Sequence, residues 1–345
     1  MGDKTYKQQK RILFLTDFQR ISYGVVGYRY RKVLLNLGIE SEEIQTPDSD
    51  SQRSEIASKY KGSIVFHNTL GFNFIPIPEC YNIALPAHEW NLYPRDWCEN
   101  LNRFDESWAP SHHVRNLLKR SGVITPVYFM PEALNLHSIP QKTQWNVDKP
   151  FQFLFCGESH FRKGHHLLMQ GFMLAFPKIG EATLTIKMSP SCDWIPPRED
   201  IIFIKEFWPL EKLLGLYKEY DCFVTASLAE GLGAPLAEAI LARLPVMANR
   251  WGGHTDLVPP NHPFIIKHKV VDQPFCSRPE YYTASQKCAL SLPHEVAKTL
   301  RKVFESTPQE RLESTQLALD YLLRLYDKDI VLKRIQRRLE NFNMS

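Results

Sequence analysis

Two successive rounds of alternating strand and helix patterns are the feature that most restricts how this chain folds. In the first round, short aliphatic and β-branched runs alternate with helix-period segments up to about residue 130. The second round begins near residue 150, again with a hydrophobic strand run and a loop that contains glycine. This order predicts parallel sheets with helices on both faces, so we expect an α/β protein with two Rossmann-like, doubly wound domains.

The individual elements are predicted from the same patterns. We expect strands at 12–16, 63–66, 81–85, 104–108, 125–129, 151–156, 182–188, 201–204, 222–226 and 246–248. We expect helices at 28–37, between Ser111 and Gly122, at 164–176, 210–220 and 235–243, and within 309–341. Residues 22–27, which include Gly24 and Gly27, are expected to form the first strand-to-helix loop.

Chain length and one polar segment suggest the domain boundaries. At about 150 residues per domain, 345 residues correspond to two domains. Residues 138–150 are polar and bounded by prolines, which is typical of an interdomain linker. We therefore expect an N-terminal domain at 1–140, a C-terminal domain at 150–325 and a last helix at 326–345.

The composition is that of an ordinary folded protein, with 43% hydrophobic and 23% charged residues, which excludes disordered and fibrous classes. A net charge of +4 is too small to indicate nucleic acid as a partner. Seven cysteines without a C-x-x-C pair predict free, buried thiols in a reducing compartment. No apolar run is long enough for a signal peptide or a membrane span, so we expect a cytoplasmic protein.

The densest cluster of chemically useful residues is AEGLGAPLAEA at 229–239. It follows a predicted strand and opens a helix with Pro235 in the first turn, and ligands of open α/β sheets bind at the carboxyl ends of strands. Gly231 and Gly233 let a ligand approach the backbone, and the helix start offers free N–H groups. Glu230 and Glu238 then face one crevice, where their carboxylates can accept hydrogen bonds from sugar or ribose hydroxyls.

A purely structural interpretation of these charged residues is also open. Glu238 would then only complement the positive end of the helix, and Glu230 would be solvated. In the same way, Arg162 and Lys163 also fit a solvated turn.

Three segments carry a resemblance to a known family. The first is EGLGAPLAEAILARLPVMANRWGGHTDLV, in which two glutamates are followed by a helix, a Pro-Val strand and a Gly-Gly loop. The others are FLFCGESHFRKGHHLLMQGF, after the linker, and FDESWAPSHHVRNLLKRSGV, near the end of the N-terminal domain. Together they resemble the retaining glycosyltransferases of the GT-B fold, glycosyltransferase family 4, over nearly the whole chain. The resemblance implies two domains facing across a cleft, with the last helix packed back on the N-terminal domain.

The same resemblance implies a nucleotide-sugar donor held mainly by the C-terminal domain. Glu238 would bind the ribose hydroxyls. Glu230 would bind hydroxyls of the transferred sugar, together with the backbone amides of Gly231, Leu232 and Gly233.

Lys163 falls at the position of the family's diphosphate-binding lysine, beside Arg162. Two phosphates in a cleft require cations, because negative charge grows on the leaving group as the glycosidic bond breaks. The family often has Gly-Arg after the preceding strand, whereas this chain has Gly157-Glu158. Either Arg162 replaces that arginine or the loop is arranged differently, so the detailed phosphate contacts stay open.

Three further residues are candidates through their place in the pattern. The family's first loop, here with Gly24, approaches the donor phosphate and the acceptor, and the region of His88 lines the cleft near the reacting sugar. An ordinary turn glycine and a hydrogen-bonded structural histidine also explain these two residues. Phe207, in the turn 205–208, and the loop after 182–188 are candidates for recognising the base.

We expect neither a metal nor another cofactor. The adjacent histidine pairs at 112–113 and 165–166 point to different faces of a helix, so the members of each pair cannot bind the same ion. The Asp-Ser-Asp at 48–50 is expected in a solvated polar loop, 45–53, with no strand before it.

The expected function is transfer of a sugar from a nucleoside-diphosphate donor to an acceptor hydroxyl, with retention of the anomeric configuration. The acceptor is a glycan, a lipid-linked molecule or a small molecule, and peripheral membrane contact is compatible with this function. A catalytically silent sugar-nucleotide-binding subunit is one alternative. An NAD-dependent oxidoreductase of Rossmann type is another, disfavoured because the first loop lacks G-x-G-x-x-G.

Overall fold

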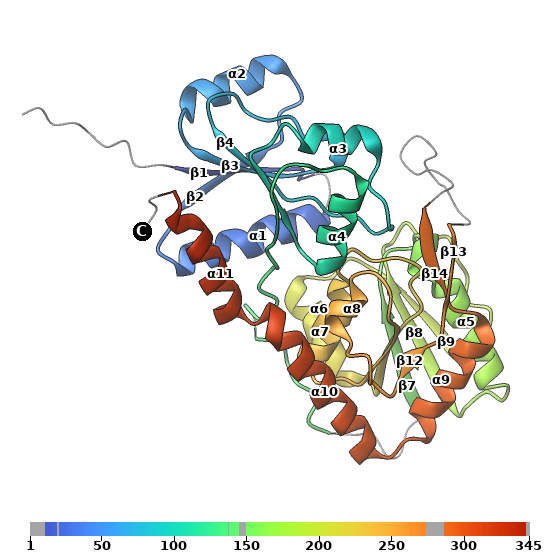
Figure 1. The fold of residues 1–345 in the computed structure, drawn as a ribbon. Coiled ribbons are helices and arrows are strands. Elements are labelled where there is room, and N and C mark those ends of the chain that lie inside the picture. The colour runs from blue at the N-terminus through green and yellow to red at the C-terminus, as the bar shows by residue number, and fades with distance from the viewer. Residues whose placement is uncertain (1–10, 19–20, 137, 145–149, 274–285, 343–345) are drawn as a thin grey trace, which may run out of the picture. The chain divides into compact units, whose positions relative to one another are not determined.

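The computed structural model describes residues 11–18, 21–136, 138–144, 150–273 and 286–342, and the chain divides into two compact units (Figure 1). Unit 1 takes in Met1–Ala87, Tyr93–Leu136 and Lys328–Ser345. Unit 2 takes in His88–Leu92 and His137–Asp327. The chain therefore enters unit 2 briefly after residue 87, returns to unit 1, and comes back to unit 1 again after residue 327.

Unit 1 is built on a six-stranded parallel sheet in the order β2-β1-β3-β4-β5-β6. Its strands are β1 (Ile12–Thr16), β2 (Ser41–Gln45), β3 (Ile64–Asn68), β4 (Tyr81–Ala84), β5 (Glu106–Ala109) and β6 (Val127–Phe129). Its helices are α1 (Ile21–Asn36), α2 (Asp50–Lys59), α3 (Arg95–Leu101), α4 (His112–Ser121) and α11 (Lys328–Glu340), with a 3-10 turn, η1 (Gly71–Asn73). The strand order reverses between β1 and β3, as in a doubly wound sheet, so the predicted fold class is confirmed for this unit.

Helix α11 completes the hydrophobic core of unit 1. Val331, Ile335 and Leu339 recur on one face of the helix and are fully buried against residues of the sheet and of α1. Arg338 of the same helix forms an ion pair with the buried Glu106 of β5. The unit therefore needs a segment that follows the whole of unit 2 in the sequence.

The first helix begins earlier than the sequence predicts. Residues 22–27 were expected to form a loop, but α1 starts at Ile21 and includes both Gly24 and Gly27. Glycine costs about 1 kcal/mol in a helix relative to alanine, which made the loop prediction reasonable. The structure gives the reason at Gly27, where a Cβ atom would lie 2.8 Å from a Glu43 carboxylate oxygen and 3.1 Å from the Thr16 hydroxyl.

The prediction of a polar loop without a preceding strand at 45–53 is also wrong. Strand β2 ends at Gln45, and α2 begins at Asp50. The Ser49 hydroxyl accepts a hydrogen bond from the Gln52 amide and caps the helix. The two aspartates of this segment are exposed, as expected.

Unit 2 contains a second six-stranded parallel sheet, in the order β12-β11-β10-β7-β8-β9. The strands are β7 (Phe151–Cys156), β8 (Ala182–Met188), β9 (Ile201–Lys205), β10 (Cys222–Thr225), β11 (Val246–Asn249) and β12 (Ile265–Ile266), with an antiparallel pair β13 (Lys269–Asp272) and β14 (Lys287–Leu290). From β7 the chain builds outward through β8 and β9 and then returns to β10. The reversal of strand order therefore lies between β7 and β10, and the doubly wound prediction is confirmed here as well.

The helices of unit 2 cover both faces of this sheet, with α5 and α9 on one side and α6 and α7 on the other (Figure 1). They are α5 (His165–Ala175), α6 (Leu210–Leu216), α7 (Ala234–Leu241), α8 (His254–Leu257), α9 (Pro293–Glu305) and α10 (Pro308–Tyr326), with 3-10 turns η2 (Phe161–Lys163) and η3 (Tyr217–Glu219). Among the residues described, no helix combines the length and the apolar character that crossing a bilayer requires.

The segment expected to be an interdomain linker is anchored on unit 2 at residue 142. The Lys142 ammonium lies 3.4 Å from the Asp221 carboxylate, with both side chains almost completely buried, and its amide donates to the Ala242 carbonyl. Six cysteines are free thiols, as predicted, and all but Cys80 are buried; Cys276 lies outside the described residues.

Candidate active site

Two loops leave the carboxyl ends of β7 and β10, the strands on either side of the switch point in unit 2. Backbone and side-chain bonds tie them together. The Arg162 carbonyl of the first loop accepts from the Leu228 amide at 2.8 Å and from the Ser227 hydroxyl at 3.1 Å. The position agrees with the expectation that a ligand of this sheet binds at its carboxyl edge.

Gly164 allows this close approach of the two loops. Its φ angle is +69°, and an added Cβ would lie only 2.1 Å from the Ala226 carbonyl oxygen. Only glycine fits here, because both the backbone conformation and the space exclude a side chain. The residue follows Arg162 and Lys163 directly, so it fixes where their side chains begin.

The two cations converge on Glu230, a pairing that was not predicted from the sequence. The Lys163 ammonium lies 2.8 Å and 3.0 Å from the two carboxylate oxygens of Glu230, and Arg162 lies 3.3 Å from one of them. The Ser227 hydroxyl donates to the same carboxylate at 2.9 Å. Glu230 is thus held by two cations and a hydroxyl at the switch point.

This environment keeps Glu230 ionised. Burial alone raises the pKa of its carboxyl, but Lys163 and then Arg162 lower the pKa more strongly, with a smaller effect of His254, and the result is a pKa of about 2. A carboxylate that stays charged at neutral pH accepts hydrogen bonds and cannot donate a proton. The site therefore offers a permanent acceptor between two permanent donors.

Arg162 also contacts a segment from far back in the sequence. Its Nη2 lies 2.8 Å from a carboxylate oxygen of Glu89, and its Nη1 donates to the Ala229 carbonyl at 2.7 Å. Burial raises the pKa of Glu89, whereas Arg162 and then His88 lower it, and the net pKa lies below the ordinary value. The guanidinium is therefore oriented from two sides.

The Gly-Gly loop after β11 supports the loop that carries Glu230. The Gly253 amide donates to the Glu230 carbonyl at 2.8 Å. An added Cβ at Gly252 would lie 2.7 Å from that carbonyl, and one at Gly231 would lie 2.9 Å from the His88 carbonyl. These glycines let three backbone segments stack on one another, which fixes the path of the loop.

Glu238 lies on α7 and is buried. The Tyr217 hydroxyl donates to one of its carboxylate oxygens at 2.8 Å. Burial and the neighbouring Glu238 raise the pKa of Tyr217 well above its ordinary value, so the phenol stays a donor. Glu238 lies one turn into the helix. The N-cap of the helix is Gly233, whose φ angle is +99°.

The other predicted site residues are placed as follows. Leu232 is buried between Gly231 and the helix start, so only its backbone can serve a ligand. Phe207 follows β9, which is the second strand from β7 in the sheet, so the two strands lie about 10 Å apart. Its side chain is 68% exposed. His88 is buried in unit 2 beside the glycine loop. Gly24 belongs to unit 1, whereas the other predicted site residues belong to unit 2.

Three residues of the site were not predicted. Ser227, Glu89 and Tyr217 each hold one of the predicted side chains. Ser227 had a usable signal, because it directly follows a buried strand next to the glutamate motif. Glu89 adjoins the candidate His88, but nothing in the sequence pairs it with Arg162. Tyr217 looks like an ordinary residue at the end of a helix.

Among the residues that the structure describes, no group of three His, Cys, Asp or Glu side chains is arranged to bind a metal ion. The adjacent His165 and His166 rings lie nearly perpendicular, 5.8 Å apart. His166 instead stacks on Phe161 at 3.6 Å.

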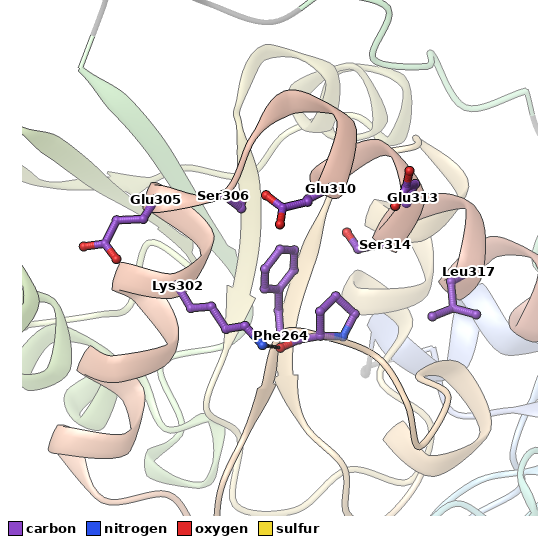
Figure 2. Close-up of a pocket in the computed structure, with 9 residues that line it drawn as sticks. Phe264, Lys302, Glu305, Ser306, Glu310, Glu313, Ser314 and Leu317 are labelled. Atoms are coloured by element: carbon purple, nitrogen blue, oxygen red, sulfur yellow. Dashed lines mark hydrogen bonds between the residues drawn. The ribbon is translucent and has the colours of Figure 1, made fainter.

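A surface cavity of about 510 Å³ lies away from this cluster, at the junction of α9 and α10 (Figure 2). Its polar side chains serve the fold. The Lys302 ammonium donates to the Pro263 carbonyl at 2.8 Å, and Glu310 forms a capping box with Thr307 at the start of α10. We therefore assign the candidate active site to the switch point.

A family model matches part of unit 2. The model for "Glycosyl transferases group 1" matches residues 150–273, which include Arg162, Lys163, Glu230 and Glu238. No curated protein sequence matches the chain.

Solved structures show the fold of the whole chain. Anabaena Alr3699/HepE, in complex with UDP-glucose, aligns with a TM-score of 0.71 and 16% identity over 96% of this chain and 99% of its own. A glycosyltransferase from Rickettsia africae ESF-5 aligns with a TM-score of 0.71 and 14% identity over 98% and 100%. The pneumococcal O-GlcNAc transferase GtfA, in complex with UDP and GlcNAc, gives 0.62 and 14% over 85% of this chain, which spans only 60% of GtfA.

Proposed function

From a glycosyltransferase domain of group 1 set in a GT-B fold, we propose that this protein transfers a sugar from a nucleoside-diphosphate donor to a hydroxyl group of an acceptor, with retention at the anomeric carbon. The observation that carries the proposal is the cluster of Lys163, Arg162 and Glu230 at the switch point of unit 2. The neighbours that bind UDP or UDP-glucose support a nucleotide sugar as donor. The acceptor is a glycan or another hydroxyl-bearing molecule.

In this proposal the two cations serve the diphosphate. Lys163 and Arg162 are fixed side by side by the turn that ends at Gly164, and Arg162 is oriented further by Glu89. Charge develops on the phosphate oxygen as the glycosidic bond breaks, and fixed cations in a protected site stabilise that charge. Arg162 thereby supplies the guanidinium that position 158, a glutamate, lacks.

Glu230 and the glycine loop serve the transferred sugar. The permanently charged carboxylate accepts hydrogen bonds from sugar hydroxyls, and the amides of Gly231, Leu232 and Gly233 are donors at the start of α7. His88, whose carbonyl packs against Gly231, lines the same end of the loop.

In this proposal Glu238 binds the ribose hydroxyls. The Tyr217 hydroxyl donates to one oxygen of its carboxylate and so orients the carboxylate. Exposed Phe207, beyond the end of β9, is assigned to stacking on the base.

The reaction then needs little acid–base chemistry from the protein. The bond between the anomeric carbon and the phosphate oxygen breaks while the bond to the acceptor oxygen forms on the same face of the sugar. The acceptor proton passes to the leaving phosphate oxygen. Glu230 remains a carboxylate at neutral pH, which supports a role in positioning and charge stabilisation.

The two glutamates give a direct test. Glu238→Gln should weaken binding of the nucleoside diphosphate itself by about 1.5–3 kcal/mol, because the ribose is common to donor and product. Glu230→Gln should leave that affinity nearly unchanged and lower turnover, because its partner is the sugar. A thermal-shift screen of nucleoside diphosphates first identifies the base, and calorimetric titration and a donor-consumption assay then compare the variants.

The alternatives give different results in the same assays. A silent binding subunit would bind the nucleotide and lose affinity in Glu238→Gln, but neither it nor its variants would consume donor. If neither substitution changed binding or turnover, the loop from 229 to 239 would not be the donor site.

A further inference from the structure

A second cavity, of about 550 Å³, lies in unit 1 between the edge strand β6 and helix α11. We call it the β6–α11 groove. Tyr128 and Phe129 of β6 line one wall, and Ile330, Lys333, Arg334 and Arg337 of α11 line the other. It uses none of the residues that we assign to the donor.

The wall formed by α11 follows from its sequence period. Residues 330, 333, 334 and 337 lie at spacings of three and four and share one helix face, while Val331, Ile335 and Leu339 occupy the buried face. The cavity is also lined by Arg338, so it has four cations, Lys333, Arg334, Arg337 and Arg338, and no acidic residue lines it. A basic face is thus held rigidly by a core-packed helix.

Two of these cations are free for a ligand and two are used by the fold, since Arg338 pairs with the buried Glu106. Arg334 donates to the Phe129 carbonyl at 3.1 Å and covers the Phe129 ring, so it caps the strand edge. Lys333 and Arg337 are exposed, and no carboxylate of the described residues lies within ion-pairing distance of either. Their charges face the groove without an internal counterion.

We propose that the β6–α11 groove binds an extended, acidic segment of a partner polypeptide. Lys333 and Arg337 are four residues apart, or about 6 Å along the helix axis. Side chains on one face of an extended peptide recur about every 6.6 Å. In a Glu-x-Glu sequence, one glutamate can therefore contact Lys333 while the other contacts Arg337. Because Arg334 already occupies the Phe129 carbonyl at the edge of β6, the proposed contacts rest on the two cations of α11.

The shape and charge of the groove favour a peptide over other anions. A helix that binds a bilayer inserts its apolar face, whereas the apolar face of α11, with Val331, Ile335 and Leu339, is buried in the core of unit 1. A single phosphate would fill little of a cavity of this size. The net charge of +4 is small for a nucleic-acid partner.

The test uses the full chain and a fluorescein-labelled ten-residue peptide in which glutamate alternates with serine. We expect fluorescence anisotropy to show saturable binding of this peptide and none of a peptide with glutamine in place of glutamate. The double variant Lys333→Glu, Arg337→Glu should bind the acidic peptide about tenfold more weakly or worse, since each charge-assisted contact is reversed. Both cations are exposed, so the variant should unfold at the same temperature as the parent chain.

A matched double variant, Lys178→Glu with Lys298→Glu, makes the same change of net charge at exposed lysines of unit 2. It should retain binding. Equal losses in both double variants would mean diffuse charge attraction and would overturn the proposal, as would equal binding of the glutamine peptide. Binding of vesicles of anionic phospholipid, lost in Lys333→Glu, Arg337→Glu while the peptide does not bind at all, would assign the groove to a membrane surface instead.

Discussion

At the scale of single residues, the two cations at the switch point of unit 2 are paired with carboxylates of the protein itself. Lys163 contacts both oxygens of Glu230, and Arg162 lies between Glu230 and Glu89. In the proposed complex the diphosphate binds these two cations, next to the carboxylate that binds the sugar.

The low pKa of Glu230 predicts a specific dependence of stability on pH. The folded-state pKa of about 2 lies below the unfolded value of about 4.3, so the carboxylate stabilises the fold above pH 4.3 and the contribution is lost as the pH falls toward 2. Glu230→Gln should thus lower the free energy of unfolding by on the order of 3 kcal/mol at pH 7, and the difference should shrink between pH 4.3 and pH 2. Urea unfolding at pH 7, 5 and 3 measures it.

The exposed Glu199→Gln is the control for that experiment and should show little difference at any of these pH values. A gap between the parent chain and Glu230→Gln that stays constant down to pH 3 would refute the charge-based explanation. The loss would then come from packing alone.

The side-chain cations also predict how activity responds to chelators. If Lys163 and Arg162 neutralise the diphosphate, donor consumption should continue in EDTA at an unchanged rate. Lys163→Met should instead lower turnover by about a hundredfold, in the range seen when one stabilising donor is removed from a transition state. Loss of activity in EDTA, with recovery on adding magnesium or manganese, would contradict this account of the phosphate site.

At the scale of elements, the sequence predicted best those segments whose burial is uniform. β1, β7 and β8 have the predicted bounds, because β1 and most of β7 are short apolar runs and β8 alternates apolar residues with threonine and lysine. β2 was missed because SEEIQ is an edge strand with no fully buried residue. The start of α1 was misplaced because helix propensity disfavours glycine, whereas tight packing of Gly27 on β1 requires it.

The candidate site divides in the same way. That Arg162, Lys163 and Glu230 lie at one edge of the sheet follows from their place after strands, because parallel strands end at one edge, but the pairing of the cations with Glu230 was not predicted from the sequence. The contact of Glu89 with Arg162 was not, because the path of the segment 88–92 into unit 2 depends on tertiary packing. Propensities and periods carry no information about such a contact.

Gly164 gives a prediction at this scale, because it sets the junction of the loops after β7 and β10. Gly164→Ala should cost about 2–4 kcal/mol of unfolding free energy, from the positive φ together with the clash on the Ala226 carbonyl. Gly180→Ala has a positive φ of 103° but open space, so only the backbone penalty of about 1–2 kcal/mol applies. Denaturant titration compares them, and equal losses would show that the steric contact is unimportant.

At the scale of the whole molecule, the two units have separate cores, so we expect two unfolding transitions. Ile335→Ala leaves a cavity in the core of unit 1 and should lower only that unit's transition, at a cost of about 2–5 kcal/mol. A nucleoside diphosphate should raise only the transition of unit 2. Calorimetry with and without the nucleotide measures both effects.

Ile330→Ala, on the exposed face of the same helix, is the matched control and should change neither transition by more than about 0.5 kcal/mol. If Ile335→Ala shifted both transitions equally, the units would unfold as one cooperative block.

The return of the chain to unit 1 through α11 also orders events during synthesis. Ribosomes release the polypeptide from its N-terminus at about 5–20 residues per second, and domains generally fold as they emerge. Residues 1–136 leave the exit tunnel first, but their core lacks Val331, Ile335 and Leu339 until α11 has been made. Unit 2 can therefore finish folding before unit 1, although its residues come later in the sequence. Until α11 has been made, one apolar face of the unit 1 sheet stays uncovered, and chaperones can bind it.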